Sequence, residues 1–195
     1  MDPKWYVVAH RVLDSEVCQE LASMISTQEL YTIQTNWYKQ HRPSDLSHLL
    51  VPVIQSLVPK ISEHLQAAIG PEGLRGAKPR TGTAWSVGTE LQLIPGTVSP
   101  RVFLEGCYMD WHIDYIHEHS TESVYECILT LSNTSDSMTV FKRGPRMESV
   151  STEPGTVLVL QRRGVCHQVT PVTYGERMTV KFSLRQRILD QETRV

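Results

Sequence analysis

A chain of 195 residues with 40% hydrophobic side chains can bury one sizeable core, so we expect a single domain over residues 1–195. The formal net charge of −2 gives no overall attraction to nucleic acid or to anionic membranes. No apolar run has membrane-spanning length, and the N-terminus lacks the regions of a signal peptide, so we expect a cytoplasmic protein. Four isolated cysteines favour reduced thiols over disulfides or a zinc site.

The N-terminal region, to about residue 80, is expected to provide helices that support the rest of the domain. Residues 5–9 predict a short strand. Asp14 then stands where an N-cap residue is favoured, ahead of a helix whose apolar face consists of Val17, Leu21, Met24 and Ile25. A strand followed by an amphipathic helix is therefore expected at the start of the chain.

The next stretch is less regular. Residues 30–45 show no clean period, and we expect a loop that lies over the mouth of the core; loops in such a place often cover substrates, and whether this one does stays open. From Leu46 to Ile69 apolar residues recur at helical spacing, but Pro52 and Pro59 interrupt the pattern. We expect two abutting helical segments there, followed by a connection over residues 70–88.

The C-terminal region, about residues 81–188, consists of short apolar or alternating stretches divided by turn residues. Strands are expected near residues 89–94, 101–106, 108–115, 125–132, 137–141, 147–151, 156–161, 165–172 and 177–185. Many short strands separated by turns suit a jelly roll, whose core depends on pairing between distant strands. The fold class we expect is mainly β (α+β), a jelly roll with supporting N-terminal helices.

Three side chains of this region can bind one metal ion. In His112-Ile113-Asp114, alternation along a strand places the imidazole and the carboxylate on one face. A second imidazole from a distant strand, for which His167 is the candidate, completes the ligand set of non-heme Fe(II) oxygenases. A lone H-x-D motif is weak, because it also occurs by chance, so its neighbours must decide.

The strand predicted over residues 175–185 carries an anion-binding pattern. Arg177 and Thr179 share one face of it, while Val180, Phe182 and Leu184 share the other. A guanidinium presents two parallel N–H donors to a carboxylate, and a nearby hydroxyl adds a third bond. The pattern suits a dicarboxylate.

Together these motifs resemble a known family. The segments that carry the resemblance are Leu104 to Asp114, Tyr125 to Asn133, Thr139 to Phe141, Pro154-Gly155, His167, Pro171-Val172 and Gly175 to Arg177. They look like the Fe(II)/2-oxoglutarate-dependent dioxygenases, nearest the prolyl 4-hydroxylase-like branch. Residues 5–25 also resemble the strand and helix with which that branch opens. The likeness spans most of the chain and implies a double-stranded β-helix.

The resemblance also implies roles for single residues. His112, Asp114 and His167 would be the iron ligands, and Arg177 would hold the distal carboxylate of 2-oxoglutarate, helped by Thr179 and Tyr108. The cosubstrates would be 2-oxoglutarate and O2, with ascorbate as a possible stimulant. Hydroxylation of an unactivated C–H bond with release of succinate and CO2 is the implied reaction. Prolyl hydroxylases often have Lys at the position of Arg177, so prolyl specificity does not carry over.

The substrate stays open at this point. Scattered basic residues either gather for an acidic ligand or form a solvated face: Lys39, Arg42, Lys142, Arg143, Arg146, Arg162 and Arg163. His117, Glu118 and His119 follow the first ligand pair in a loop that meets either substrate or solvent. We expect Trp111 and Tyr115 to face away from the ligands into the core.

An amino-acid, peptidyl or small natural-product substrate ranks first, and a nucleic-acid substrate ranks lower, because only 7% of residues are aromatic. A cupin-like barrel that binds a metal or a sugar is the main rival, although it gives Arg177 no role. A catalytically silent binding barrel is a third possibility. The oligomeric state is not predicted.

Overall fold

The computed structural model describes residues 6–36, 38–43, 46–69, 89–114, 124–161 and 165–188. Within them lie two helices, α1 (Ser15–Ser26) and α2 (Ser47–Ile69). The strands are β1 (Tyr6–Ala9), β2 (Leu30–Gln34), β3 (Tyr38–Pro43), β4 (Thr89–Leu93), β5 (Ser99–Phe103), β6 (Tyr108–His112), β7 (Val124–Asn133), β8 (Thr139–Arg143), β9 (Arg146–Val150), β10 (Val157–Gln161), β11 (Cys166–Val169) and β12 (Arg177–Ile188). Each strand expected between residues 89 and 185 is present, with ends shifted by a few residues.

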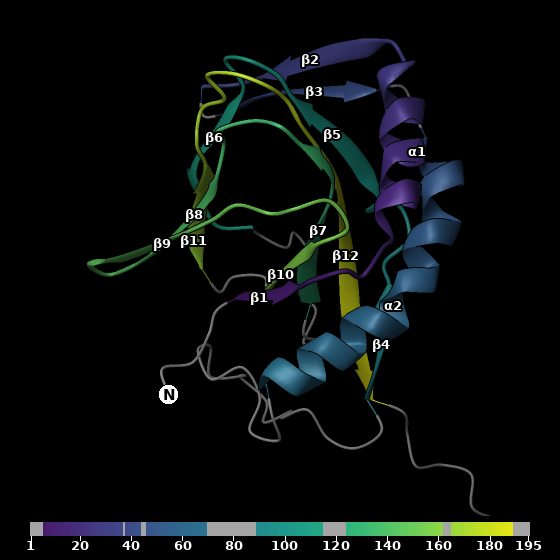
Figure 1. The fold of residues 1–195 in the computed structure, drawn as a ribbon. Helices are drawn as coiled ribbons and strands as arrows, with labels where there is room; N and C mark the ends of the chain where they lie inside the picture. Colours follow the sequence, from purple (N-terminus) through teal and green to yellow (C-terminus); the bar gives the residue numbers. More distant parts are fainter. Residues whose placement is uncertain are drawn as a thin grey trace, which may run out of the picture.

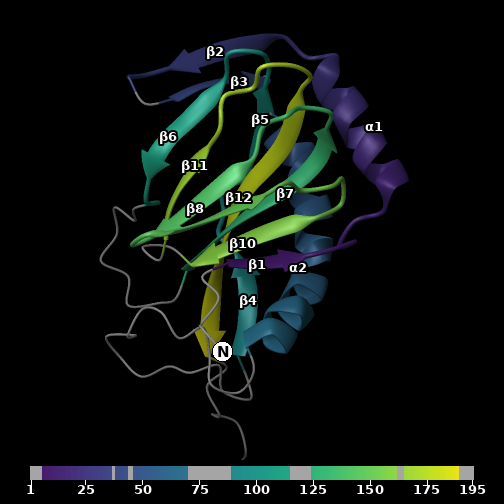
Figure 2. The same cartoon turned by 60° about the vertical axis from the view of Figure 1, so that its left-hand side comes forward.

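The strands form one antiparallel sheet that curls back on itself. Its main path runs β1-β10-β7-β12-β5-β3-β6-β11-β8-β9, with β2 paired to β3 and β4 paired to β12. Neighbours along this path are mostly distant in sequence, as in a jelly roll. Because of the curl, β6, β11 and β8 lie opposite β5, β12 and β7 (Figures 1 and 2). The predicted fold class, mainly β with jelly-roll topology, is confirmed.

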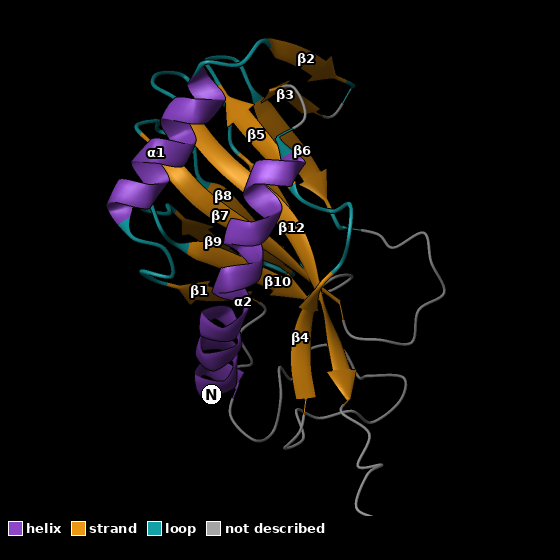
Figure 3. Ribbon diagram, turned by 90° about the vertical axis from the view of Figure 1, so that its right-hand side faces the viewer, coloured by secondary structure: helices purple, strands orange, loops and turns teal. Residues whose placement is uncertain are grey.

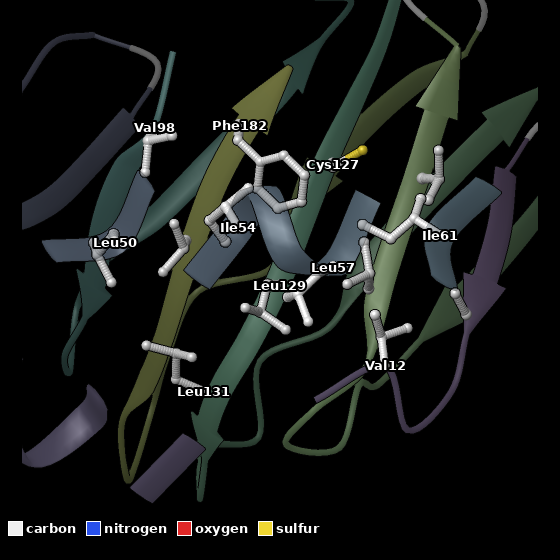
Figure 4. Packing of buried hydrophobic residues seen from close by; sticks show 14 of the residues in the cluster. Val12, Leu50, Ile54, Leu57, Ile61, Val98, Cys127, Leu129, Leu131 and Phe182 are labelled. Carbon is white, nitrogen blue, oxygen red and sulfur yellow. The ribbon is translucent and has the colours of Figure 1, made fainter. Parts of the chain in front are cut away.

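The two helices cover the outer face of one half of this sheet, as Figure 3 shows. Buried residues of α1 and α2 join strand residues in the largest apolar cluster, where Ile54 and Leu57 meet Leu129 and Phe182 (Figure 4). Val180, Phe182 and Leu184 are 0% exposed on this side of β12. Burying such side chains contributes roughly 1.5–3 kcal/mol each. The face of β12 that looks away from the helices, starting with Arg177, is called the inner face below.

Residues 46–69 differ from the prediction of two helical segments. The structure has one helix, α2, with Pro52 and Pro59 inside it. Both prolines are exposed, while Leu50, Ile54 and Leu57 are buried. On the solvent side the carbonyls that lose a partner to a proline can bond to water, and the helix bends rather than breaks. The bend is visible in Figure 1. Within the described residues, no helix is both long and apolar enough to cross a membrane.

Within residues 30–45, the described residues 30–36 and 38–43 also differ from the prediction, because they contain two paired strands rather than a covering loop. Strands β2 and β3 pair over Leu30–Pro43, and β3 continues the sheet by pairing with β5 and β6. The strand was hidden in the sequence because Tyr38 to Arg42 is polar on both faces, so no apolar alternation marks it. This pair of strands bridges the two halves of the curled sheet.

A small cluster closes the other end of the curl. Tyr6 of β1 stacks on Phe141 of β8, with ring centroids 4.2 Å apart. Phe141 packs with Leu158 and Leu160 of β10 in the same cluster. The two halves of the sheet are therefore held together by side chains as well as by the β3 pairing, and polar residues of the inner face lie between them.

Candidate active site

The three predicted metal ligands lie together between the facing halves of the sheet. His112 ends β6 and pairs directly with His167 of β11, and Asp114 follows two residues after the strand. One ligand atom from each residue lies within 4.8 Å of the other two. Asp114 Oδ2 is 3.5 Å from His167 Nε2, and the two imidazole centroids are 4.2 Å apart. Ligand atoms around one octahedral ion are roughly 3 Å apart, so a small contraction suffices.

A bulge in β6 aims His112 at this centre. On β11, His167 and Val169 are two residues apart, whereas their partners on β6, His112 and Met109, are three apart. One extra residue on β6 therefore brings both Met109 and His112 to the inner face. A regular strand would have placed one of them on the outside.

The same bulge bears on Tyr108. Tyr38 of β3 pairs with Met109, and Lys39 pairs with Tyr108, so Tyr108 lies on the face opposite to Met109. The cosubstrate role of Tyr108 stays a prediction. On the inner face it is Tyr38 that lies near the polar residues.

Hydrogen bonds to backbone carbonyls select one tautomer for both histidines. Nδ1 of His112 is 2.7 Å from the carbonyl oxygen of Asp110, and Nδ1 of His167 is 3.1 Å from that of Val165. Because a carbonyl can only accept, each Nδ1 carries the proton and donates it. Burial lowers the pKa of His167 to about 4, aided by His112 and opposed by Asp114. His167 is therefore neutral at neutral pH, with the lone pair of Nε2 facing the centre.

Lys181, which the sequence did not single out, holds the other oxygen of Asp114. Its Nζ donates to Asp114 Oδ1 at 2.7 Å and lies 3.4 Å from Glu126 Oε2. Ser183 Oγ lies 3.1 Å from Oε1 of the same Glu126. Asp114 thus keeps Oδ2 toward the histidines while Oδ1 is occupied, which limits it to one coordinating oxygen.

Arg177 is a buried cation without a counterion among the described residues. Its side chain is 2% exposed, and Nη2 donates to Thr139 Oγ1 of β8 at 3.2 Å. Nε and Nη1 are buried with no hydrogen-bond partner. Burial lowers its pKa to about 10, so the guanidinium stays charged at neutral pH. Leaving a charge buried and unpaired costs several kcal/mol, so an anion is expected here.

The Arg177 guanidinium lies on the same inner face of the sheet as the histidines. Thr139, which it contacts, lies two residues along β8 from Phe141, and Phe141 pairs with His167. Two strand residues span about 6.6 Å. Thr179, 2% exposed, is the next residue on the inner face of β12. Arg177 therefore contacts a residue that lies about one such span along β8 from the strand partner of His167.

Comparison with known proteins was made with sequence and with structure. No family profile matches the chain, and no curated protein matches it in sequence. A prolyl-4-hydroxylase from Pseudomonas putida is similar in structure, with a TM-score of 0.63 at 13% identity, over 94% of this chain and 93% of that one. The chain has the fold of the 2-oxoglutarate/Fe(II) oxygenases.

Two further solved structures have the same likeness. An oxidoreductase of the 2OG-Fe(II) oxygenase family from Burkholderia pseudomallei has a TM-score of 0.62 at 12% identity, covering 93% of this chain and 85% of that one. HygX from Streptomyces hygroscopicus, with nickel and 2-oxoglutarate bound, has a TM-score of 0.62 at 13% identity, covering 94% and 84%. At this identity the likeness concerns the fold, and residue roles rest on the geometry above.

Several residues on the inner face were missed or only partly recognised from the sequence. Thr139 was named only within a segment that carries the resemblance and was given no role. Lys181 was not singled out, although it follows Arg177 and Thr179 at the same two-residue spacing. Arg42 was placed only in a diffuse basic set. Other predictions fall outside the described residues: those on Tyr115, His117, Glu118, His119, Arg162 and Arg163.

Proposed function

We propose that the protein is an Fe(II)- and 2-oxoglutarate-dependent dioxygenase. The observation that carries this proposal is that a two-histidine, one-carboxylate cluster shares the inner face with a buried guanidinium that has no counterion among the described residues. The cluster provides the ligand types of a non-heme iron site, and Arg177 provides the anion site that an oxoacid needs. The shared fold with oxygenases, one of them with nickel and 2-oxoglutarate bound, supports the proposal.

The donor set fits Fe(II). Nε2 of His112, Nε2 of His167 and Oδ2 of Asp114 would hold the ion, since each Nδ1 is already a donor and Oδ1 is bonded to Lys181. Three protein ligands leave the remaining positions for the oxoacid and dioxygen. The loaded centre would supply oxidation of a C–H bond coupled to release of succinate and CO2.

The chain's own residues would orient and sequester the cosubstrate. Arg177 would bind the distal carboxylate through Nε or Nη1, which lack a partner, in parallel with the second N–H of Nη2, while the first N–H of Nη2 stays fixed by Thr139. Thr179 would add a hydroxyl on the same face. Phe103, Met109 and Val169 form an apolar cluster that would exclude water from one side of this path.

We propose hydroxylation of an amino-acid, peptidyl or small natural-product substrate as the reaction. The intact carboxylate ligand Asp114 and the oxygenase fold support this class. A cupin-like barrel explains the metal cluster equally well, but it gives no reason to bury Arg177 without a counterion. The guanidinium is therefore the feature that separates the two hypotheses.

Binding of metal and oxoacid to the purified protein tests the proposal. Calorimetry with Ni(II), which does not support turnover, should show 2-oxoglutarate binding that depends on the metal. His112→Ala should abolish metal binding, and Arg177→Met should weaken oxoacid affinity by roughly 30-fold or more while metal binding persists. With Fe(II), ascorbate and 2-oxoglutarate, the wild type should form succinate and both variants should not.

Stability measurements on the same variants separate binding from folding. Because Arg177→Met removes an unpaired buried charge, the free protein should be as stable as the wild type or more stable, by up to about 1–4 kcal/mol. Exposed His48 and Arg146 provide matched controls, and His48→Ala and Arg146→Met should change neither affinity. Oxoacid binding that ignores Arg177, or that needs no metal, would contradict the proposal and favour a cupin-like or silent barrel.

A further inference from the structure

Two more arginines lie side by side on the inner face. Arg101 of β5 pairs directly with Thr179 of β12, and its neighbour Val102 is 1% exposed on the helix side. Arg101 therefore points to the inner face, like Thr179. His41 of β3 pairs antiparallel with Val102, so the register puts Arg42 opposite Arg101 on that face. Thr179, Arg101 and Arg42 form one row across three strands.

Neither guanidinium of this pair has an ion-pair partner among the described residues. Nε of Arg42 and Nε of Arg101 are buried without a hydrogen-bond acceptor. Among the described residues, Arg101 hydrogen-bonds from Nη1 to the sulfur of Met109, a weak acceptor, at 3.7 Å. Burial, and then the charge of Arg42, lower the pKa of Arg101 to about 10. Like charges directly opposite each other destabilise a sheet.

The nearby carboxylates are already occupied. Asp114 bonds to Lys181 and faces His167, and Glu126 lies against Lys181 and Ser183. On the described inner face, four cationic side chains, Arg42, Arg101, Arg177 and Lys181, stand against these two carboxylates. The excess positive charge needs an anion that the described residues do not supply.

A buried acceptor lies next to the pair. Gln40 is two residues from Arg42 on β3 and therefore shares its face. The side chain is 1% exposed, and its Oε1 has no hydrogen-bond partner. Acceptor and donor groups thus lie together without partners, as in a binding site for a polar group.

The oxoacid does not account for the Arg42–Arg101 pair. On the proposed function, one carboxylate of 2-oxoglutarate lies at the metal and the other at Arg177. We propose that Arg42 and Arg101 form a second anion site that binds a carboxylate or phosphate group of the substrate. Gln40 would receive an N–H or O–H donor of the same molecule. This inference rests on the proposed function and narrows its substrate to molecules that carry an anionic group.

The chemistry of the pair supports this choice. Each guanidinium is planar and can bind two oxygens of one anion at once, and two such groups side by side surround a carboxylate or a phosphate. Arg101 also interacts electrostatically with Asp114, so the anionic end of the substrate would lie close to the metal centre. The substrate carbon that reacts would then be only a few bonds away from the anionic group.

Titration with matched acid and neutral compounds tests the second site. Protein loaded with Ni(II) and 2-oxoglutarate is titrated in a calorimeter with N-acetylglutamate against N-acetylglutamine, and with glycerol phosphate against glycerol. At least one anion should bind about tenfold or more tightly than its neutral partner. The two pairs distinguish a carboxylate from a phosphate. Arg42→Gln and Arg101→Gln should each remove the preference and leave 2-oxoglutarate affinity within about threefold.

Controls keep the outcomes apart. Arg101→Lys should retain part of the preference for the anion, because lysine keeps the positive charge but lacks the parallel N–H donors of a guanidinium. Arg146→Gln on exposed β9 should retain all of the preference. Equal binding of acid and neutral compounds overturns the second site. So does an Arg101→Gln variant that loses 2-oxoglutarate as severely as Arg177→Met, since Arg101 would then serve the cosubstrate.

Failure of the proposed function has a different signature. If the wild type binds neither Ni(II) nor 2-oxoglutarate, the oxygenase proposal fails. The same titrations on protein without metal and oxoacid then decide whether the arginine pair binds anions by itself. This is possible because the preference for the anionic over the neutral compound is measured without turnover.

Discussion

Lys181 lies between two carboxylates and shapes the chemistry of one of them. Burial raises the pKa of Asp114, but the charge of Lys181, the electrostatic interaction with the His167 ring and the Lys181 hydrogen bond outweigh it, and the net pKa is lowered. A carboxylate with a lowered pKa is ionised over a wider range of pH. Lys181 therefore keeps Asp114 available to a metal ion when the solution becomes acidic.

Replacing Lys181 by Met should raise the pKa of Asp114. A proton then competes with the metal at higher pH, so on acidification Ni(II) should be lost at higher pH than in the wild type. Calorimetric titrations from neutral to acid pH measure the midpoint, which is the pH at which half of the Ni(II) binding is lost. Lys142→Met removes an exposed lysine of β8 and should leave the midpoint unchanged. A midpoint that does not move in Lys181→Met would mean that the hydrogen bond has no influence on the site.

At the scale of the elements, the turn before β10 fixes the segment between β1 and α1. Gly155 has a φ of +79°, and its carbonyl oxygen accepts hydrogen bonds from the backbone N–H groups of Val12 at 2.9 Å and Leu13 at 3.4 Å. A Cβ at this position would overlap the carbonyl oxygen of Leu13. Glycine is required here both for its conformation and for this close approach.

Gly155→Ala should therefore destabilise the protein more than another substitution at positive φ. Gly96 has a φ of +73° and open space around its missing Cβ, so Gly96→Ala isolates the backbone cost of about 1–2 kcal/mol. Gly155→Ala should add roughly 1–3 kcal/mol because backbone atoms must move. Denaturant unfolding of both variants measures the difference. Equal losses would show that the Leu13 contact relaxes freely.

The elements also show where periodicity was informative. The strands of the jelly roll were predictable because apolar residues and turn residues mark them locally. Strand β3 was not, since Tyr38 to Arg42 has polar residues on both faces and becomes a strand only by pairing with β5 and β6. Helix α2 is continuous, although its prolines predicted two segments, because both prolines lie on its exposed side.

For the whole molecule, the proposed ligands would connect parts of the curled sheet that side chains connect only in part. The metal would join β6 to β11, and the oxoacid would extend to Arg177 on β12, which contacts β8. A ligand that binds only the folded state stabilises it by mass action. The free energy of unfolding of the protein should therefore increase when both ligands are present.

Thermal unfolding tests this linkage. At about 100 times its dissociation constant, 2-oxoglutarate should stabilise the Ni(II)-loaded protein by about 2.7 kcal/mol, or roughly 5–11 °C for a domain of this size. The oxoacid without metal should give a much smaller shift, and Asp114→Ala should remove the shift. A large stabilisation of the metal-free protein would instead indicate an anion site that does not involve the metal.

Local pattern determined most of the strands, the helix after Asp14 and the candidate residues His112, Asp114, His167 and Arg177, because each of these depends on neighbours within a few positions. The tertiary structure decided which of those residues share one face. A single extra residue in β6 turns His112 inward, cross-strand pairing sets Arg42 beside Arg101, and the curl of the sheet brings Lys181 to Asp114. A count of alternating positions cannot register a one-residue bulge, and no local signal encodes a contact between strands that meet only when the sheet curls.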